Sequence, residues 1–193
     1  MINHKEKAEE TWRDLNKRKN DLFFKNTKSV IYEQTKDFTR FIKKNLADEH
    51  LTVLDCACGN GVQANYLNEN LSTGKFFAYD INKYLINEAK QAFPTISWFV
   101  HDCYEAIKLS EPIDLVYSLQ TLSVLPQGYK KHFNTIEKLG PKNFSGSILL
   151  WGGDGDYSLN INNNRGAFVY NLYNMGDFKN SLKNYGGARL PFS

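Results

Sequence analysis

The sequence contains few cysteines, no long apolar run and almost no excess of charge. Its three cysteines, Cys56, Cys58 and Cys103, are an odd number and too few for a disulfide-stapled miniprotein. Free thiols in a reducing compartment are therefore expected. No stretch of about 18 apolar residues occurs, and the N-terminus MINHKEKAEETWRD lacks the apolar segment of a signal peptide. These absences predict a cytoplasmic protein with no membrane span.

Length and composition favour one globular unit. Of the 193 residues, 41% are hydrophobic and 14% aromatic, which argues against a disordered chain. The 24 basic and 21 acidic residues give a net charge of only +3, so charge neither indicates nor excludes a nucleic acid. We expect a single domain over 1–193, with a helical cap in 1–50, a ligand-binding core in 51–151 and a C-terminal loop and helix in 152–193.

After residue 50, short apolar runs alternate with helical patterns. This alternation is typical of an α/β fold with a doubly wound, mostly parallel sheet. Strands are predicted at Leu51–Leu54, Phe76–Tyr79, Ile96–Val100, Ile113–Tyr117 and Ile148–Trp151. Helices are predicted at Ala8–Phe23, Val30–Ile42, Asn82–Phe93 and Gly128–Leu139, and from Asp177 onward. The run AFVYNLY, from Ala167, fits either a strand or a helical turn.

A glycine-containing loop after the first predicted strand is the most informative feature of the sequence. It lies within TVLDCACGNGVQA, where Gly59 and Gly61 let the backbone pass close to a ligand at a helix N-terminus. The same letters fit the dinucleotide pattern G-x-G-x-x-A, so NAD is one candidate. However, Asp55 and three more residues precede Gly59, which would place a carboxylate near a pyrophosphate. A cationic ligand is therefore favoured over NAD.

Two further acids follow the next two predicted strands. Asp80 ends the strand FFAYD, where a carboxylate can accept hydrogen bonds from both hydroxyls of an adenosyl ribose. Alternatively, Asp80 caps the next helix, a role that Asn82 fills equally well. Asp102 follows the third strand, where it can accept from an adenine amino group. Because the carboxyl ends of parallel strands share one edge, Asp55, Asp80 and Asp102 are predicted to meet there.

At these residues the sequence resembles the class I S-adenosylmethionine-dependent methyltransferases. VLDCACGNG is similar to their first motif, with Asp55, Gly59 and Gly61 in place and Ala57 where the first glycine usually stands. AYDIN, HDCYE and DLVYSLQTLSVLP are similar to the motifs of the second, third and fourth strands. The resemblance covers about residues 50 to 151. It implies a Rossmann-like core that binds S-adenosylmethionine.

The resemblance also implies roles for individual residues. Asp80 would bind the ribose, Ile81 would pack on the adenine, and Asp102 and Cys103 would lie along it. The end of the fourth strand would lie beside the methionine part of the cofactor and the acceptor. The predicted cofactor-binding residues are Asp55, Ala57, Gly59, Asn60, Gly61, Asp80, Ile81, Asp102, Cys103, Ser118 and Leu119.

Two departures from the family pattern narrow the interpretation. The fourth-strand segment reads SLQT, which differs from the Asn-Pro-Pro-Tyr type and disfavours methylation of exocyclic base amines. In addition, too few residues follow the last predicted helix for the antiparallel hairpin that normally ends the family's fold. Either AFVYNLY does part of that work, or the chain is truncated and its fifth strand has an exposed edge. Two chains can associate at such an edge, so a homodimer is one expected outcome.

Methyl transfer needs a general base only if the acceptor arrives protonated, because the thioether departs neutral. His132 is the candidate base, and its alternative is a structural role in an amphipathic helix. No metal site is expected, because the spacing of Cys56, Cys58, Cys103 and His101 is wrong for zinc. Four aromatic residues either cover the pocket or pack the N-terminal helices onto the sheet: Trp12, Phe23, Phe24 and Tyr32.

Together these features predict methyl transfer from S-adenosylmethionine to an oxygen or nitrogen of a small-molecule acceptor. No basic stripe or recognition appendage indicates a macromolecular acceptor. An RNA or protein methyltransferase with the same core is an alternative, because basic residues occur at 17–19, 25 and 28. A catalytically idle domain that binds S-adenosylmethionine or a partner is the other.

Overall fold

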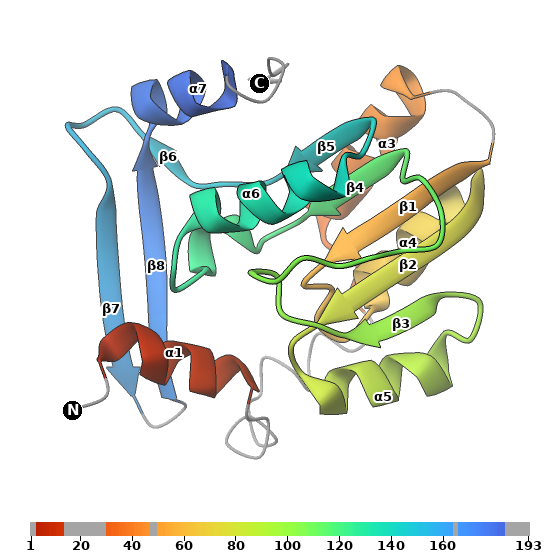
Figure 1. The fold of residues 1–193 in the computed structure, drawn as a ribbon, viewed down its shortest axis with the longest axis horizontal. Helices are drawn as coiled ribbons and strands as arrows, with labels where there is room; N and C mark the ends of the chain where they lie inside the picture. The colour runs from red at the N-terminus through yellow and green to blue at the C-terminus, as the bar shows by residue number, and fades with distance from the viewer. Residues whose placement is uncertain (1–2, 14–29, 47–49, 164–165, 184–193) are drawn as a thin grey trace.

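The computed structural model describes residues 3–13, 30–46, 50–163 and 166–183, whose arrangement Figure 1 shows. A five-stranded parallel sheet with the order β3-β2-β1-β4-β5 lies at its centre. The strands are β1 (Leu51–Cys56), β2 (Thr73–Asp80), β3 (Ser97–Val100), β4 (Leu115–Ser118) and β5 (Asn143–Gly146). The winding direction reverses between β1 and β4, which confirms the predicted doubly wound α/β fold.

Helices cover both faces of the central sheet, because successive strand residues point to opposite faces and both sets are apolar. Val53 of β1 lies in a core that includes residues of α3, α4 and α5. Its neighbour Leu54 lies in a second core with residues of α6 and α7. The helices are α1 (His4–Arg13), α3 (Glu33–Asn45), α4 (Val62–Asn70), α5 (Lys83–Ala92), η1 (Leu122–Val124, a 3₁₀ helix), α6 (Tyr129–Leu139) and α7 (Met175–Lys183).

Local signals in the sequence explain where several helices begin and end. The side chain of Asn82 accepts hydrogen bonds from the amides of Tyr84 and Leu85, at 3.0 and 3.3 Å, and so caps α5. Gly140 ends α6 in the left-handed conformation, with φ +64°. The predicted helix Ala8–Phe23 is observed only as α1, since residues 14–29 lie outside the described residues.

The predicted fifth strand, Ile148–Trp151, was wrong. The fifth strand of the central sheet is β5, which pairs with β4 from Leu115 opposite Asn143 to Ser118 opposite Gly146. β5 reads NFSG and lacks the apolar run by which the other strands were found. Leu150–Trp151 forms β6 instead, a short strand of a second sheet.

The second sheet contains the C-terminal hairpin of β7 (Tyr157–Asn163) and β8 (Gly166–Asn174). AFVYNLY therefore forms a strand, which was one of its two predicted conformations. Among the described residues, however, β8 pairs with β6 and β7 and leaves β5 at the edge of the central sheet. The hairpin is attached near η1, where the Asn171 amide donates to the Leu125 carbonyl at 3.0 Å. Association of two chains at the β5 edge stays a prediction.

Helix α1 lies between the hairpin and the carboxyl ends of β1 and β2, as Figure 1 shows. Its Thr11 hydroxyl accepts a hydrogen bond from the Ala167 amide of β8 at 3.1 Å. At its other end, the carbonyl of Trp12 accepts from the Asn82 side chain at 3.0 Å. α1 thus bridges the two sheets above the edge where the predicted motif residues lie. Within the described residues, no helix combines the length and apolar character needed to cross a membrane.

Candidate active site

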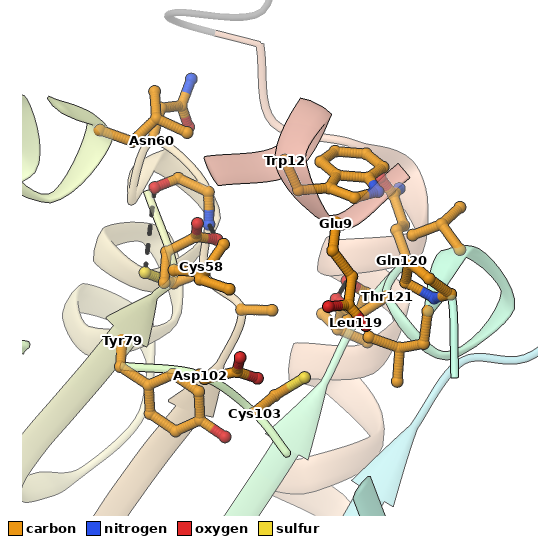
Figure 2. A pocket seen from close by; sticks show the side chains of 18 of the residues that line it. Glu9, Trp12, Cys58, Asn60, Tyr79, Asp102, Cys103, Leu119, Gln120 and Thr121 are labelled. Carbon is orange, nitrogen blue, oxygen red and sulfur yellow. Dashed lines mark hydrogen bonds between the residues drawn. The ribbon is translucent and has the colours of Figure 1, made fainter. Parts of the chain in front are cut away.

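A cavity of about 580 Å³ lies at the carboxyl ends of the central strands. Its volume is within the usual range for small-molecule sites. The loops that follow the strands form one side, and α1 contributes to the other, as Figure 2 shows for part of the lining. The β7–β8 hairpin also contributes lining residues. Eight predicted cofactor-binding residues line the cavity: Ala57, Gly59, Asn60, Asp80, Ile81, Asp102, Cys103 and Leu119.

The loop after β1 bends through several left-handed residues. Ala57 has φ +61°, a conformation that glycine adopts at less cost, which is why glycine suits this position. Gly59 has φ +59° and open space where a Cβ would be. Gly61, with φ +78°, is absent from the lining residues, and a Cβ there would lie 2.4 Å from Trp98 Cη2. Gly59 therefore exposes backbone to the cavity, whereas Gly61 lets the loop pack closely against Trp98.

Asp80 connects this loop to the end of β2. Its Oδ2 accepts a hydrogen bond from the Gly59 amide at 2.9 Å, and its Oδ1 accepts from the Asn82 amide at 2.9 Å. Asn82, not Asp80, provides the side-chain cap of α5. The carboxylate of Asp80 thus holds the glycine loop in place while also lining the cavity.

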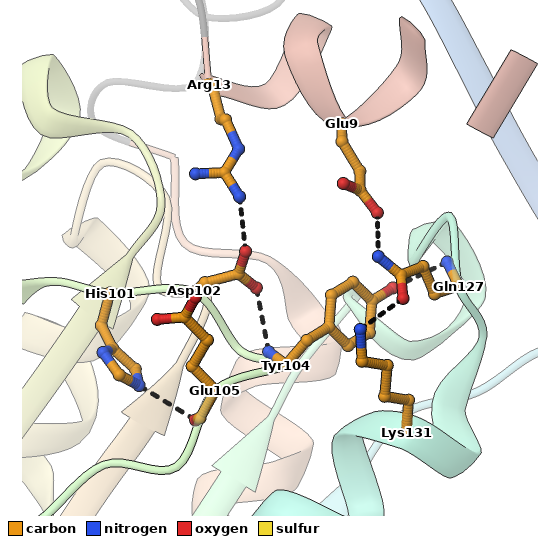
Figure 3. Close-up of polar contacts among 8 residues, drawn as sticks. All are labelled: Glu9, Arg13, His101, Asp102, Tyr104, Glu105, Gln127 and Lys131. Atoms are coloured by element: carbon orange, nitrogen blue, oxygen red, sulfur yellow. Dashed lines mark hydrogen bonds and ion pairs between the residues drawn. The ribbon is translucent and has the colours of Figure 1, made fainter. Parts of the chain in front are cut away.

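Asp102, at the end of β3, binds helix α1 through Arg13. Asp102 Oδ2 lies 2.6 Å from Arg13 Nη2, and Oδ1 accepts from the Tyr104 amide at 2.9 Å (Figure 3). The Arg13 side chain is 51% exposed and that of Asp102 only 13%. Nothing in the sequence near Arg13 indicated this ion pair, because the two residues are 89 positions apart.

Asp55 lies beneath the glycine loop and does not line the cavity. It is only 4% exposed, and the Tyr117 hydroxyl donates to its Oδ2 at 2.8 Å. Burial raises the pKa of Asp55 to about 7, although the bond from Tyr117 opposes this rise. The expectation that Asp55 would face a bound pyrophosphate is therefore corrected. The carboxylates that a cavity ligand meets on this side are Asp80 and Asp102.

Ser118 and His132 are fully buried and also lie outside the cavity lining. His132 Nδ1 lies 3.0 Å from the Cys103 carbonyl oxygen, which can only accept, so Nδ1 carries the hydrogen. His132 Nε2 therefore accepts from the Ser118 hydroxyl, 2.9 Å away. Burial also lowers the pKa of His132 and favours the neutral ring. We revise the prediction of His132 as a base, since it joins β4 to the loop after β3 and does not reach the cavity.

The side of the cavity away from the glycine loop is largely apolar and aromatic. Trp12 and Tyr32, two of the four aromatic residues considered as a cover, contribute to the lining. Phe23 and Phe24 lie outside the described residues. The Trp12 and Phe168 rings meet edge to face, with centroids 5.9 Å apart. Lining residues that sequence reasoning did not single out include Glu9, Gln120, Thr121, Ile161, Phe168 and Tyr170.

The three cysteines are free and buried. Burial raises the pKa of Cys56 to about 12, so its thiol is protonated at neutral pH. Within the part of the chain that the structure describes, no cluster of three or more His, Cys, Asp or Glu side chains is arranged to hold a metal ion.

Comparison with known proteins identifies the segment that forms the glycine-loop side of this cavity. Residues 53–139 match a family model described as a methyltransferase domain. The matched segment runs from β1 to the end of α6 and contains the glycine loop, Asp80 and Asp102. This segment is a methyltransferase domain, which confirms the predicted resemblance to the class I S-adenosylmethionine-dependent methyltransferases. S-Adenosylmethionine is the cofactor of that family.

Individual relatives of this methyltransferase domain are distant. The "Putative methyltransferase 235L" of Invertebrate iridescent virus 6 is 28% identical over 118 residues, which cover 58% of this chain and 44% of the viral protein. The chain thus spans less than half the length of that curated relative.

Two solved structures share the fold over most of both chains. The DhpI-SAM-HEP complex has a TM-score of 0.66 at 14% identity and covers 96% of this chain and 91% of that one. The magnesium protoporphyrin IX methyltransferase ChlM of Synechocystis PCC 6803, with bound SAM, has a TM-score of 0.61 at 15% identity. That match covers 100% of this chain and 90% of ChlM. Identities this low establish a common fold only.

Proposed function

We propose that this chain transfers a methyl group from S-adenosylmethionine to an oxygen or nitrogen of a small-molecule acceptor. The observation that carries the proposal is the meeting of Gly59, Asp80 and Asp102 around one cavity in a domain of this family. The DhpI and ChlM structures, which share the fold, are complexes with SAM.

The glycine-loop side of the cavity fits the adenosyl cofactor. At Gly59 there is room for a ligand against the backbone, and Asp80 offers a carboxylate to the ribose hydroxyls. Ile81 and Leu85 provide apolar surface for a purine ring. The carboxylate of Asp80 also favours a cation over an anion on this side, whereas that of Asp102 is already paired with Arg13. When bound, the cofactor supplies an electrophilic methyl group on a sulfonium, and the pair of the broken C–S bond stays on the neutral thioether.

The remaining lining residues position the acceptor and exclude water. Leu119, Gln120 and Thr121 follow β4 and line the cavity on the side of α1. Gln120 has φ +57°, and its amide donates to Ser147 Oγ at 2.6 Å, which fixes this unusual backbone conformation. Trp12 and Phe168 cover the cavity from α1 and β8. Orientation and exclusion of water are the main contributions that a protein makes to a displacement with a neutral leaving group.

Binding of S-adenosylmethionine and S-adenosylhomocysteine, but not of NAD, is the first expected result. The pyrophosphate of NAD would find no Lys or Arg among the described lining residues to balance its charge, whereas the sulfonium of S-adenosylmethionine is a cation. Calorimetric titration with the three ligands tests this expectation. Tight NAD binding without a response to the adenosyl ligands would contradict the proposal.

Turnover distinguishes the proposal from its alternatives. Formation of S-adenosylhomocysteine with a panel of small acceptors supports the proposed enzyme, whereas binding without turnover on any acceptor supports an idle domain. Salt-sensitive binding of RNA would favour a nucleic-acid acceptor. The cytoplasmic location and the homodimer also remain proposals, and the three free thiols are compatible with a reducing compartment.

Replacement of Asp80 by alanine is expected to weaken S-adenosylhomocysteine binding by about 10- to 100-fold. The reason is the loss of hydrogen bonding to a charged group, which is worth about 1.5–3 kcal/mol in total. Calorimetry measures the affinity, and a thermal melt shows whether the variant is folded.

Two variants make the Asp80 experiment specific. Asp80→Asn keeps an acceptor for one of the two amides that Asp80 binds but removes the charge, so we expect an intermediate loss of affinity. Asp37→Ala removes an exposed carboxylate of α3 that pairs with Arg40 and is not among the lining residues, so it should leave binding unchanged. Unaltered affinity in a folded Asp80→Ala protein would mean that Asp80 serves only to hold the loop.

A further inference from the structure

The charged side chains that line the cavity are distributed unevenly. Three are carboxylates, Glu9, Asp80 and Asp102, and no Lys or Arg occurs among the described lining residues. Asp80 and Asp102 lie on the glycine-loop side, where they hold loop amides and Arg13. Glu9 extends from α1 on the side of Leu119 and Thr121, as Figure 2 shows. Glu9 is therefore the carboxylate placed to meet an acceptor.

The partners of Glu9 are compatible with a further ligand. Glu9 Oε1 accepts a hydrogen bond from the Gln127 side-chain amide, which is neutral (Figure 3). The nearby cation, Lys131, donates instead to Gln127 Oε1 at 2.5 Å, and its Nζ lies 4.9 Å from the centre of the Tyr104 ring. Gln127 thus stands between Glu9 and Lys131. Because a carboxylate can accept about four hydrogen bonds, Glu9 retains acceptor capacity for a ligand.

Aromatic and apolar side chains surround this carboxylate. Trp12 lies one helical turn from Glu9 on α1 and packs edge to face against Phe168. Ile161 and Tyr170 extend the apolar wall along the hairpin. Such a wall suits the apolar body of a ligand, and aromatic faces also attract organic cations.

We infer that the acceptor is a small amine with an aromatic or apolar body, whose amino group is bound by Glu9. The inference rests on the proposed function and concerns recognition of the acceptor, not the atom that is methylated. An ammonium group forms charge-assisted hydrogen bonds with a carboxylate. A carboxylate or phosphate on the acceptor would instead face Glu9 without a cationic partner in the described lining, which disfavours anionic acceptors.

Three probes that share a phenyl group and a short chain test this inference: phenethylamine, phenethyl alcohol and hydrocinnamate. Each is titrated calorimetrically at neutral pH into the chain, with and without saturating S-adenosylhomocysteine. We expect phenethylamine to bind at least about tenfold more tightly than hydrocinnamate, as one charge-assisted contact allows. The alcohol should bind with intermediate affinity.

Glu9→Gln should reduce this preference to less than about threefold. The substituted glutamine can still accept from Gln127, so the attachment of α1 is retained. Glu10→Gln is the matched control, because Glu10 is exposed on the same helix and is not part of the cavity lining. It removes the same charge and should keep the wild-type preference.

Two results would overturn the inference: no binding of phenethylamine at millimolar concentration, or a preference that Glu9→Gln leaves intact. Failure of the proposed function is detected by a separate experiment, the titration with S-adenosylmethionine, S-adenosylhomocysteine and NAD described above. The titrations without that ligand report the role of Glu9 in either case.

Discussion

Replacement of Gly61 by alanine is expected to destabilise the folded chain by about 3 kcal/mol. The residue has φ +78°, which costs about 1–2 kcal/mol for a residue with a Cβ. The new methyl group would also lie 2.4 Å from Trp98 Cη2 and 3.0 Å from Ala89 Cβ, and such overpacking typically costs a further 1–3 kcal/mol. The Trp98 ring cannot yield easily, since its Nε1 donates to the Phe93 carbonyl at 2.9 Å.

Urea denaturation of three variants separates the two contributions. Gly140→Ala places a Cβ at φ +64° with nothing within 4 Å, so only the conformational cost of about 1 kcal/mol is expected. Gly59→Ala, at φ +59° in open space, should lose a similar amount of stability. Equal losses in all three would show that the Trp98 ring moves aside and that Gly61 is not required for packing.

The parallel sheet was predictable wherever its strands are apolar on both faces. β1, β2 and β4 read as continuous hydrophobic runs because helices cover both sides of the sheet. β5 has four partly buried or exposed residues, NFSG, and it is a strand because β4 offers a free edge for pairing. Such a strand is determined by its neighbour in space, so no local pattern identifies it.

The two sides of the cavity also differed in how far they could be predicted from the sequence. The glycine loop, Asp80 and Asp102 each directly follow a strand, and the topology of a parallel sheet brings strand ends together. Their meeting could therefore be predicted from the sequence. Glu9 and Phe168 reach the cavity only because α1 packs against β8, and this contact joins segments over 150 residues apart, such as Thr11 and Ala167. A contact of this kind leaves no periodic signal in a single sequence.

A different misreading concerned Asp55. Its place in the motif suggested a carboxylate that faces a ligand, whereas the structure buries it under the loop against Tyr117. The sequence shows that an acid follows β1 but not on which side of the loop its side chain lies. The consequence of this burial is a dependence of stability on pH.

Stability is expected to fall as the pH rises from about 4 to about 7, because Asp55 ionises in the unfolded chain while it stays protonated in the folded one. The carboxyl has an ordinary pKa of 3.8 in the unfolded chain, and burial raises it to about 7 in the folded one. Between these values the folded state binds more protons than the unfolded state, so raising the pH favours unfolding. At about 1.4 kcal/mol for each pKa unit, the full effect is on the order of 4 kcal/mol.

The variant Asp55→Asn isolates this contribution, because asparagine has nearly the same shape and does not ionise. Urea denaturation of the wild type and the variant is measured across the range from pH 4 to pH 8. We expect the wild type to lose stability relative to Asp55→Asn as the pH rises, with most of the change complete just above pH 7. Any constant offset between the two proteins reports packing and is irrelevant to the test.

Tyr117→Phe tests independently whether the environment of Asp55 causes the pH dependence of stability. The Tyr117 hydroxyl donates to Asp55 and stabilises the ionised carboxylate, so its removal should raise the pKa of Asp55 further. The pH-dependent loss of stability in Tyr117→Phe is therefore expected to extend to higher pH than in the wild type. Parallel pH profiles for the wild type and Asp55→Asn would show instead that Asp55 ionises normally. Burial beneath the glycine loop would then not be the factor that controls its charge.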